Sequence, residues 1–241
     1  MCGSSATKGY EELVEELRRL ATRGYVKTHR KGNTGLGKTL EDMLGIQENN
    51  IPGPNGAMIE LKSARKNSTS MTTLFTKSPL PKKANSVLLG EYGYVTPESN
   101  GEKILHTTVN ASEYNTLRGR IGFKIAIGKD RIDLVNQQGK ILGYWDRFTL
   151  KERFEAKLPR VLYVKAEARG SGADEEFWYD EAWLLSGFRF DAFLSLLKEK
   201  KILCDIRIGQ YPNGRPHDHG TAFRVLPANL DACFSHRERV V

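Results

Sequence analysis

Short apolar runs of strand length, several of which alternate with polar residues, constrain the fold of this chain most strongly. A period of two predicts strands, whereas apolar residues at spacings of three and four predict amphipathic helices. The strand patterns lie at residues 57–62, 123–127, 131–135, 140–144, 161–166, 202–208 and 222–226, and the helical patterns at 10–23, 36–44, 150–158 and 190–198. Strands and helices mixed in this order predict an α/β fold, and we expect one domain with two lobes.

Two glycines mark the ends of the first two predicted helices. Gly24 follows the apolar stripe of residues 10–20, and Gly45 follows that of residues 36–44. Glycine is the residue most often found just after a helix, because it accepts the left-handed backbone that ends one. Residues 28–35 between them are rich in glycine and charge, so we expect a loop there.

Composition limits the classes of protein to which the chain can belong. Its 241 residues are 39% hydrophobic, which excludes a disordered chain, and 37 Lys+Arg against 29 Asp+Glu give a net charge of +8. A basic excess favours a polyanionic partner such as nucleic acid. Three widely spaced cysteines argue against a disulfide framework, and no apolar run is long enough for a membrane helix. We therefore expect a soluble, cytoplasmic protein.

Residues 32–39 match the pattern of a nucleotide phosphate loop, G-x-x-x-x-G-K-[ST]. Such a loop follows a buried hydrophobic strand, but charged residues precede this one. Asp205 resembles a magnesium-binding residue at the end of a strand, yet that strand continues past it. Nucleotide hydrolysis therefore remains a minor alternative, and a basic loop that grips backbone phosphates is the favoured interpretation.

Glu41, Glu60 and Lys62 form the first candidate site. Glu60 and Lys62 share one face of the strand predicted at residues 57–62, and Glu41 would join them if the helix predicted at 36–44 packs beside that strand. Carboxylates suit a hard cation such as Mg²⁺, and a lysine can stabilise charge on a phosphate. The same Glu-x-Lys string recurs in Glu155/Lys157 and Glu199/Lys201, where helical context predicts solvated charges.

The second candidate site lies near the carboxyl end of the sequence. Asp205 and Arg207 alternate on one strand face, and a carboxylate beside an arginine suits the donors and acceptors of base edges in a DNA groove. A zinc site built from the histidines with Cys204, Cys233 or His236 lacks paired close spacing, and surface ion pairs are the plainer alternative. The candidates are Asp205, Arg207, His217, Asp218, His219 and Arg224.

Three segments together resemble the MvaI/BcnI family of restriction endonucleases. They are residues 30–42 (RKGNTGLGKTLED), residues 74–79 (LFTKSP), and the pair DIRIG at 205–209 with HDHGTAFR at 217–224. The resemblance implies a restriction-endonuclease-like PD-(D/E)xK core, a mixed central sheet flanked by helices, related to the nicking enzyme MutH. It further implies a catalytic lobe at roughly 1–168 and a recognition lobe at roughly 169–241.

The resemblance also implies a function and a set of residues. The function is Mg²⁺-dependent cleavage of double-stranded DNA by a monomer at a short pseudosymmetric site of the CCNGG or CCWGG type, without a nucleotide cofactor. Catalysis would fall to Glu41, Asn55, Glu60 and Lys62, with the metal held by Asn55, Glu60 and Leu61. DNA would be bound by Arg30, Lys31, Asn33, Lys38, Lys77, Asp205, Arg207, His217, Asp218, His219 and Arg224.

Asn55 departs from the family pattern, which has aspartate there. A neutral amide can still coordinate through its oxygen, but it removes one negative charge from the metal site. Asn55 is either an inactivating replacement of the aspartate, which we favour, or a natural variation. Two alternatives therefore stay open: a MutH-like nicking enzyme and a DNA-binding protein without catalytic activity.

Overall fold

The computed structural model describes residues 9–46, 50–52, 58–158 and 160–241. The chain divides into two compact units, each made of separate stretches of sequence. Unit 1 comprises Met1–Ser70, Ala156–Phe188 and Phe234–Val241, and unit 2 comprises Met71–Glu155 and Arg189–Cys233. This division differs from the expected boundary at residue 168, because residues 160–169 and 176–186, on either side of that boundary, pair as antiparallel strands of one sheet.

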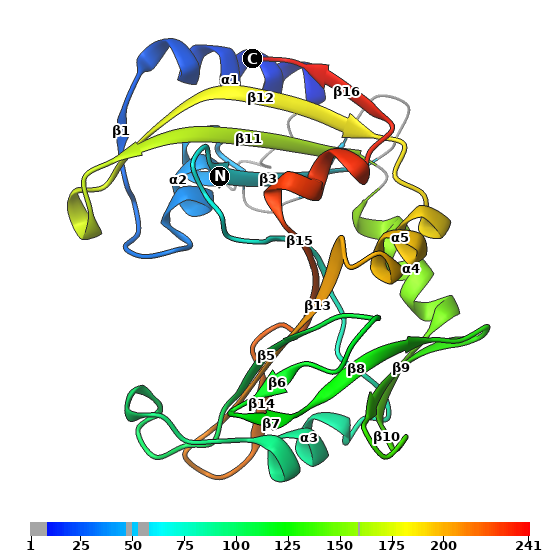
Figure 1. Ribbon diagram of the computed structural model, residues 1–241. Helices are drawn as coiled ribbons and strands as arrows, with labels where there is room; N and C mark the ends of the chain where they lie inside the picture. The colour runs from blue at the N-terminus through cyan, green and yellow to red at the C-terminus, as the bar shows by residue number, and fades with distance from the viewer. Residues whose placement is uncertain (1–8, 47–49, 53–57, 159) are drawn as a thin grey trace, which may run out of the picture. The chain divides into compact units, whose positions relative to one another are not determined.

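Unit 1 is built on a single mixed sheet (Figure 1). Its strand order is β1-β12-β11-β3-β2, with β16 paired to β12; β3 and β11 are parallel and the other pairs are antiparallel. The strands are β1 (Val26–Lys27), β2 (Asn50–Pro52), β3 (Met58–Arg65), β11 (Arg160–Arg169), β12 (Glu176–Ser186) and β16 (His236–Arg239), and the helices are α1 (Tyr10–Arg23) and α2 (Gly35–Leu44).

One face of this sheet carries the core of unit 1. Apolar residues of α1 and α2 pack there against alternate residues of the central strands, including Ile59 and Leu61 of β3. Because side chains alternate along a strand, Glu60 and Lys62 lie on the opposite face. The strand pattern at residues 57–62 therefore predicted the correct face for both.

Unit 2 holds the remaining sheets and an aromatic core. In its main sheet the order is β14-β13-β15-β4 with β5 on β13, and a second sheet has the order β10-β9-β8. Phe75, Phe154, Phe193 and Phe223 pack ring against ring, with centroids 5.2–6.1 Å apart. The strands are β4 (Thr72–Thr76), β5 (Leu105–Val109), β6 (Thr116–Leu117), β7 (Arg120–Ile121), β8 (Phe123–Ile127), β9 (Arg131–Asn136), β10 (Ile141–Asp146), β13 (Ile202–Gln210), β14 (Pro216–Asp218) and β15 (Ala222–Val225), and the helices are α3 (Ala84–Tyr92), α4 (Arg147–Lys157) and α5 (Phe190–Lys198). The last two residues of α4, Ala156 and Lys157, belong to unit 1.

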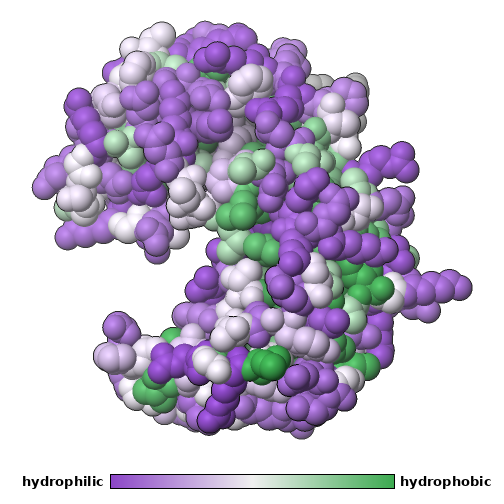
Figure 2. Space-filling view, in the orientation of Figure 1, coloured by the Kyte–Doolittle hydropathy of each residue, from purple (hydrophilic) through white to green (hydrophobic). Residues whose placement is uncertain are grey.

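The mixed α/β class is confirmed, and each strand and helix predicted from the pattern is present with small shifts at its ends. Gly24 and Gly45 follow α1 and α2 as expected, and Gly45 has the left-handed backbone of a helix end, with φ 64°. None of the helices in the described ranges is long and apolar enough to cross a membrane. Hydrophilic residues cover most of the face seen in Figure 2.

Candidate functional site

The opposite face of β3 carries an ionic cluster in unit 1. Oε1 of Glu60 lies 3.5 Å from Nζ of Lys62, and Oε2 of Glu60 lies 3.0 Å from Nζ of Lys157. The side chains of Glu60, Lys62 and Lys157 are only 11%, 14% and 20% exposed. Each oxygen of this largely buried carboxylate therefore faces one ammonium group.

Sequence reasoning missed Lys157, because it placed the Glu155/Lys157 string on a solvated helix face. Glu155 does lie there, paired with Lys151 at 3.6 Å with both side chains more than half exposed. Lys157 is the last residue of α4, and the following strand β11 runs parallel to β3 with Val161 opposite Glu60. That register brings Lys157 back to Glu60, a non-local placement that no local pattern signals. The prediction of solvated charges is wrong for Lys157 and confirmed for Glu199 and Lys201.

Burial changes the acid–base chemistry of Lys62. Removal of its ammonium from water lowers the pKa below the usual value for lysine, and attraction to Glu60 partly offsets that shift. An ammonium with a lowered pKa releases its proton more readily than a surface lysine does. Lys62 therefore suits a role that moves a proton or meets developing negative charge.

Glu41 is not joined to this cluster by any ion pair or hydrogen bond described within unit 1. It lies in α2, which packs on the core side of the sheet: a Cβ added to Gly37 would lie 3.5 Å from Oγ of Ser63 on β3. Leu40 and Leu44 beside Glu41 are buried in the core. Convergence of Glu41 with Glu60 and Lys62 thus stays a prediction.

The residues that match the phosphate-loop pattern do not have the structure of such a loop. Helix α2 already begins at Gly35, so the backbone N–H of Lys38 donates to the carbonyl of Thr34 as in any helix. The hydroxyl of Thr39 is buried and accepts a hydrogen bond from the backbone of His29 at 2.9 Å. These groups are engaged within the chain, so they do not form a cradle for a nucleotide.

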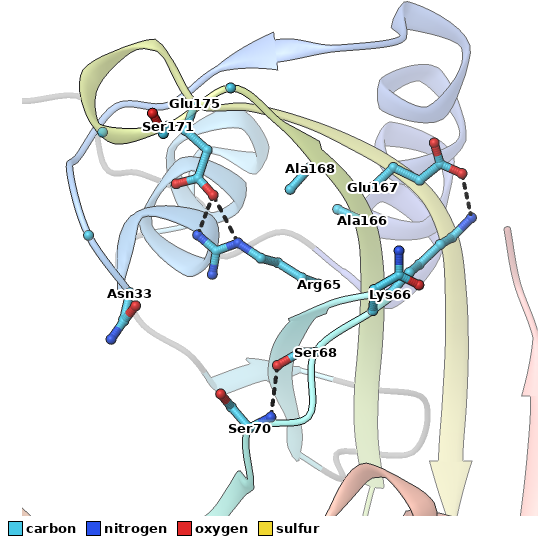
Figure 3. Close-up of a pocket in the computed structure, with 14 residues that line it drawn as sticks. Asn33, Arg65, Lys66, Ser68, Ser70, Ala166, Glu167, Ala168, Ser171 and Glu175 are labelled. Carbon is cyan, nitrogen blue, oxygen red and sulfur yellow. Dashed lines mark hydrogen bonds and ion pairs between the residues drawn. The ribbon is translucent and has the colours of Figure 1, made fainter.

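A pocket of about 740 Å³ opens in unit 1 beside this loop (Figure 3). Asn33 lines it, together with Arg65 and Lys66 from the end of β3. Nε and Nη2 of Arg65 both donate to Glu175, at 2.9 and 2.6 Å, and Lys66 pairs with Asp180 at 2.5 Å. Its two cations are thus neutralised by carboxylates of the same unit, and the pocket carries no excess positive charge for an anion.

In unit 2 a second buried carboxylate organises the face of β13. Asp205 is 0% exposed, and its Oδ2 lies 2.9 Å from Nε of Arg207 and 3.0 Å from Nε of Arg224. Its Oδ1 accepts a hydrogen bond from the hydroxyl of Thr108 at 3.1 Å. Asp205 is therefore the shared anionic partner of the two guanidinium groups, and its predicted part in contacting bases stays a prediction.

Asp218, the last residue of β14, anchors a tight turn that continues to Thr221. Oδ1 of Asp218 accepts the backbone N–H groups of Gly220 and Thr221, at 2.8 and 2.7 Å, and Oδ2 accepts from Ser78 and Asn85. Burial opposes ionisation of this carboxyl, but the four hydrogen bonds together hold its pKa below the usual value. Asp218 therefore anchors the turn that presents His217 and His219.

His106 lies beside Arg207 and His219, a position that the sequence pattern did not predict. It lies on β5 opposite Arg207 of β13, with its ring 6.1 Å from that of His219. Its Nε2 is buried and has no hydrogen-bond partner among the described residues. Gly209 makes room for the neighbouring ring, since a Cβ there would overlap Nε2 of His219. Burial lowers the pKa of both histidines, and Arg207 lowers that of His106 further.

The zinc alternative has no support in the described residues. No group of three or more His, Cys, Asp or Glu in those ranges could hold a metal ion. Cys204 and Cys233 are buried free thiols, and burial raises the pKa of Cys233 to about 12. A thiol that resists deprotonation is a poor metal ligand.

Comparison with known proteins gives the family. The model of the MvaI/BcnI restriction endonuclease family matches residues 14–234. This chain belongs to the MvaI/BcnI restriction endonuclease family. Two solved structures are similar to this chain. The first, "Restriction endonuclease MvaI-cognate DNA substrate complex", has a TM-score of 0.81 and 31% identity, over 96% of this chain and 98% of that one. The second, "Restriction endonuclease MvaI in the absence of DNA", has a TM-score of 0.56 and 29% identity, over 100% of each chain. No curated protein sequence matches the chain.

Members of the MvaI/BcnI family are nucleases, and the fold of this chain is that of MvaI. Of the residues that the family resemblance implied for catalysis, Glu60 and Lys62 lie together, whereas Asn55 lies outside the described residues. The side chain of Leu61 is buried in the core, so only its carbonyl could meet a metal. Arg30, Lys31, Asn33 and Lys38 are exposed in unit 1, and Lys77 is half-buried in unit 2.

Proposed function

We propose that this member of the MvaI/BcnI family is a type II restriction endonuclease that cleaves double-stranded DNA with Mg²⁺. The recognition sequence is a short pseudosymmetric one of the CCNGG or CCWGG type, cut one strand at a time by a monomer in the prokaryotic cytoplasm. The observation that carries the proposal is the pairing of Glu60 with Lys62 at 3.5 Å on one strand face, in a chain similar over 96% of its length to a restriction enzyme bound to cognate DNA.

The donor set fits Mg²⁺. This ion is usually held by one or two carboxylates together with substrate phosphates and water, not by an all-protein cage. Glu60 supplies one carboxylate, and the carbonyl of Leu61 and the amide oxygen of Asn55 would complete the protein ligands. When bound, the ion would lower the pKa of a water molecule and neutralise charge on the scissile phosphate.

The protein's own residues would do the remaining work. The ammonium of Lys62, held next to Glu60 and shielded from water, would meet the negative charge that develops on phosphorus-bound oxygen. Its lowered pKa also allows it to give up a proton at the same place. Glu41 from α2 would assist, as the family resemblance implies.

Base recognition would rest on unit 2. Nε of Arg207 donates a hydrogen bond to Asp205 and Arg224 forms an ion pair with it, and an arginine held by such a carboxylate can donate to both O6 and N7 of guanine. His217 and His219, presented by the Asp218 turn, would add donors. Arg30, Lys31, Asn33, Lys38 and Lys77 would contact backbone phosphates, which makes binding strongly dependent on salt.

The experiment is a digest of a mapped plasmid that contains CCWGG and other CCNGG sites. Asn55→Asp with Mg²⁺ should raise cleavage by orders of magnitude, because it restores a negative charge to the metal site. Glu60→Gln on that background should abolish cleavage while the protein still binds cognate DNA. Unchanged cleavage after Asn55→Asp would contradict the role of residue 55, and cleavage that survives Glu60→Gln would contradict the site as a whole.

The same digest separates the two alternatives. A nicking enzyme leaves open circles that never become linear, whereas a restriction enzyme that cuts one strand at a time passes through open circles to linear DNA. If the chain with Asn55 only binds DNA and does not cleave it, the plasmid stays supercoiled. The neutral side chain of Asn55 favours this alternative over the nicking enzyme.

A further inference from the structure

We infer that Lys157 is an internal counter-cation for Glu60, and that it makes metal binding at this carboxylate depend on DNA. The inference rests on the proposed function, in which Glu60 is a metal ligand. Lys157 is thus a positioning residue: it acts through Glu60 in the free protein and through a DNA phosphate in the complex.

Positive charge already compensates the carboxylate of Glu60. Glu60 has two oxygens, and each already faces an ammonium, Lys62 at 3.5 Å and Lys157 at 3.0 Å. Among these three side chains two ammonium groups face one carboxylate, and all three are largely shielded from water. A divalent cation that approaches this cluster meets repulsion, because shielding from water strengthens interactions between charges.

Of the two lysines, Lys157 is the one whose ammonium can move away from Glu60. Lys62 follows Glu60 by two residues on the same strand, so its backbone keeps it at the site. Lys157 is the last residue of α4 and its side chain is the more exposed of the two, at 20% against 14%. The carboxyl end of a helix stabilises a nearby cation, and a lysine stem has rotatable bonds that allow its ammonium to move. Lys157 can therefore leave Glu60 without losing all favourable contacts.

Bound DNA would offer Lys157 another anionic partner. A phosphodiester brings a negative charge that can accept the ammonium of Lys157 and an oxygen that can join Glu60 around a metal ion. DNA then strengthens metal binding, and by thermodynamic reciprocity the metal strengthens binding of DNA by the same factor. In the free protein Lys157 occupies the carboxylate and keeps metal affinity low.

The test measures metal binding without DNA and without cleavage. Mn²⁺, which prefers the same oxygen ligands as Mg²⁺, is titrated into the DNA-free Asn55→Asp protein and free Mn²⁺ is followed by electron paramagnetic resonance. Lys157→Met, which keeps the aliphatic stem, should tighten Mn²⁺ binding about ten-fold or more, since one facing charge is removed. Lys157→Gln should do the same if the Met variant does not fold, and Lys157→Arg should bind Mn²⁺ as weakly as the parent.

Lys165→Met is the matched control. Lys165 lies on β11, its side chain is 31% exposed, and it pairs with Glu181 at 3.1 Å. Its replacement therefore also breaks an ion pair of unit 1, but that ion pair does not involve Glu60. Mn²⁺ affinity should not change in this variant. An equal gain in Lys165→Met and Lys157→Met, or no gain in either Lys157→Met or Lys157→Gln, would overturn the inference.

The salt dependence of DNA binding tests whether Lys157 contacts a DNA phosphate in the complex. In EDTA, Lys157→Met should lower the slope of log affinity against log salt by about 0.9, the effect of one lost phosphate contact, whereas Lys165→Met should leave it unchanged. An unchanged slope in Lys157→Met would also overturn the inference.

Glu60→Gln separates this inference from the proposed function. If Glu60 is not a metal ligand, Mn²⁺ binding survives Glu60→Gln and the proposed function fails. If Glu60→Gln removes Mn²⁺ binding but Lys157→Met leaves it as in the parent, the function stands and only the role of Lys157 is lost.

Discussion

The two units each contain a buried carboxylate between two cations, but the cations differ. Asp205 in unit 2 is held by two arginines and a threonine hydroxyl and is 0% exposed, whereas Glu60 in unit 1 is held by two lysines and is 11% exposed. A guanidinium is planar and presents its donors in fixed directions, whereas an ammonium is a compact charge on a mobile stem. The Asp205 cluster thus suits a rigid template, and the Glu60 cluster suits a site whose partners exchange.

The largest expected effect is a loss of folding stability when Asp205, the centre of the rigid cluster in unit 2, is replaced. Asp205→Ala should lower the free energy of unfolding by about 3–5 kcal/mol, because it leaves two partly buried guanidinium groups without their counter-charge. Glu60→Ala should cost less, since the flexible stems of Lys62 and Lys157 allow their ammonium groups to turn toward water. Urea denaturation of both variants measures the difference, and an equal loss would show that the two clusters do not differ in rigidity.

The next largest expected effect is a loss of base discrimination when Arg207 of the rigid cluster is replaced. Arg207→Ala should lose about 1–3 kcal/mol of discrimination at one base pair of the recognition sequence, and Arg207→Lys should recover little of it, because an ammonium cannot make two parallel hydrogen bonds. Competition binding with oligonucleotides changed one pair at a time provides the measurement. Arg215, exposed in the nearby β13–β14 hairpin, is the matched control. A penalty profile identical to that of the wild type would rule out base reading by Arg207.

A pH effect should follow from the histidines beside the rigid cluster. The pKa of His106 is lowered in the folded chain, so the folded state favours the neutral ring. Its contribution to stability is therefore present above the unfolded pKa of about 6.5 and is lost as pH falls through the folded pKa. Unfolding free energies measured from pH 7.5 down to pH 5 should decrease, and His106→Asn should flatten that decrease. A slope that His106→Asn leaves unchanged would assign the titration to other groups.

The smallest expected effect lies outside both clusters, at the surface of unit 1. Lys38 pairs with Asp42 at 2.7 Å on an exposed helix face and would exchange that partner for a DNA phosphate. Lys38→Ala should weaken binding to all sequences alike and reduce the salt slope by about 0.9. Lys151→Ala, which also removes an exposed lysine from a helical pair, should leave the slope unchanged. Loss of affinity for cognate DNA alone would instead give Lys38 a part in sequence recognition.

Local patterns predicted the parts of this molecule that local physics determines. The alternation at residues 57–62 predicted the faces of Glu60 and Ile59, and Gly24 and Gly45 predicted two helix ends. The sequence pattern did not predict strand β12, because a register shift interrupts the alternation of buried and exposed residues along it. Phe177 and Tyr179 are buried two residues apart, but the next buried residues, Ala182 and Leu185, follow at spacings of three.

Long-range pairing determines the rest of the candidate site. Lys157 reaches Glu60 only through the parallel register of β11 and β3, and His106 meets Arg207 only because β5 pairs with β13. Neither strand pairing has a signal in the neighbouring sequence. The strand pattern already placed Glu60 and Lys62 on one face, and the family resemblance gave them a catalytic role, but neither indicated which residues surround Asp205.

The separation of Glu60 and Lys157 along the chain has a consequence for how the protein folds. The two residues are 97 positions apart, and the segment between them contains much of unit 2. Parallel pairing of β3 with β11 must close that long loop, and contacts of such high sequence separation form slowly. The last strand, β16, adds to the same sheet only from residues 236–239. The part of unit 1 that is made first therefore waits for the whole stretch Met71–Glu155 before its ionic cluster can form.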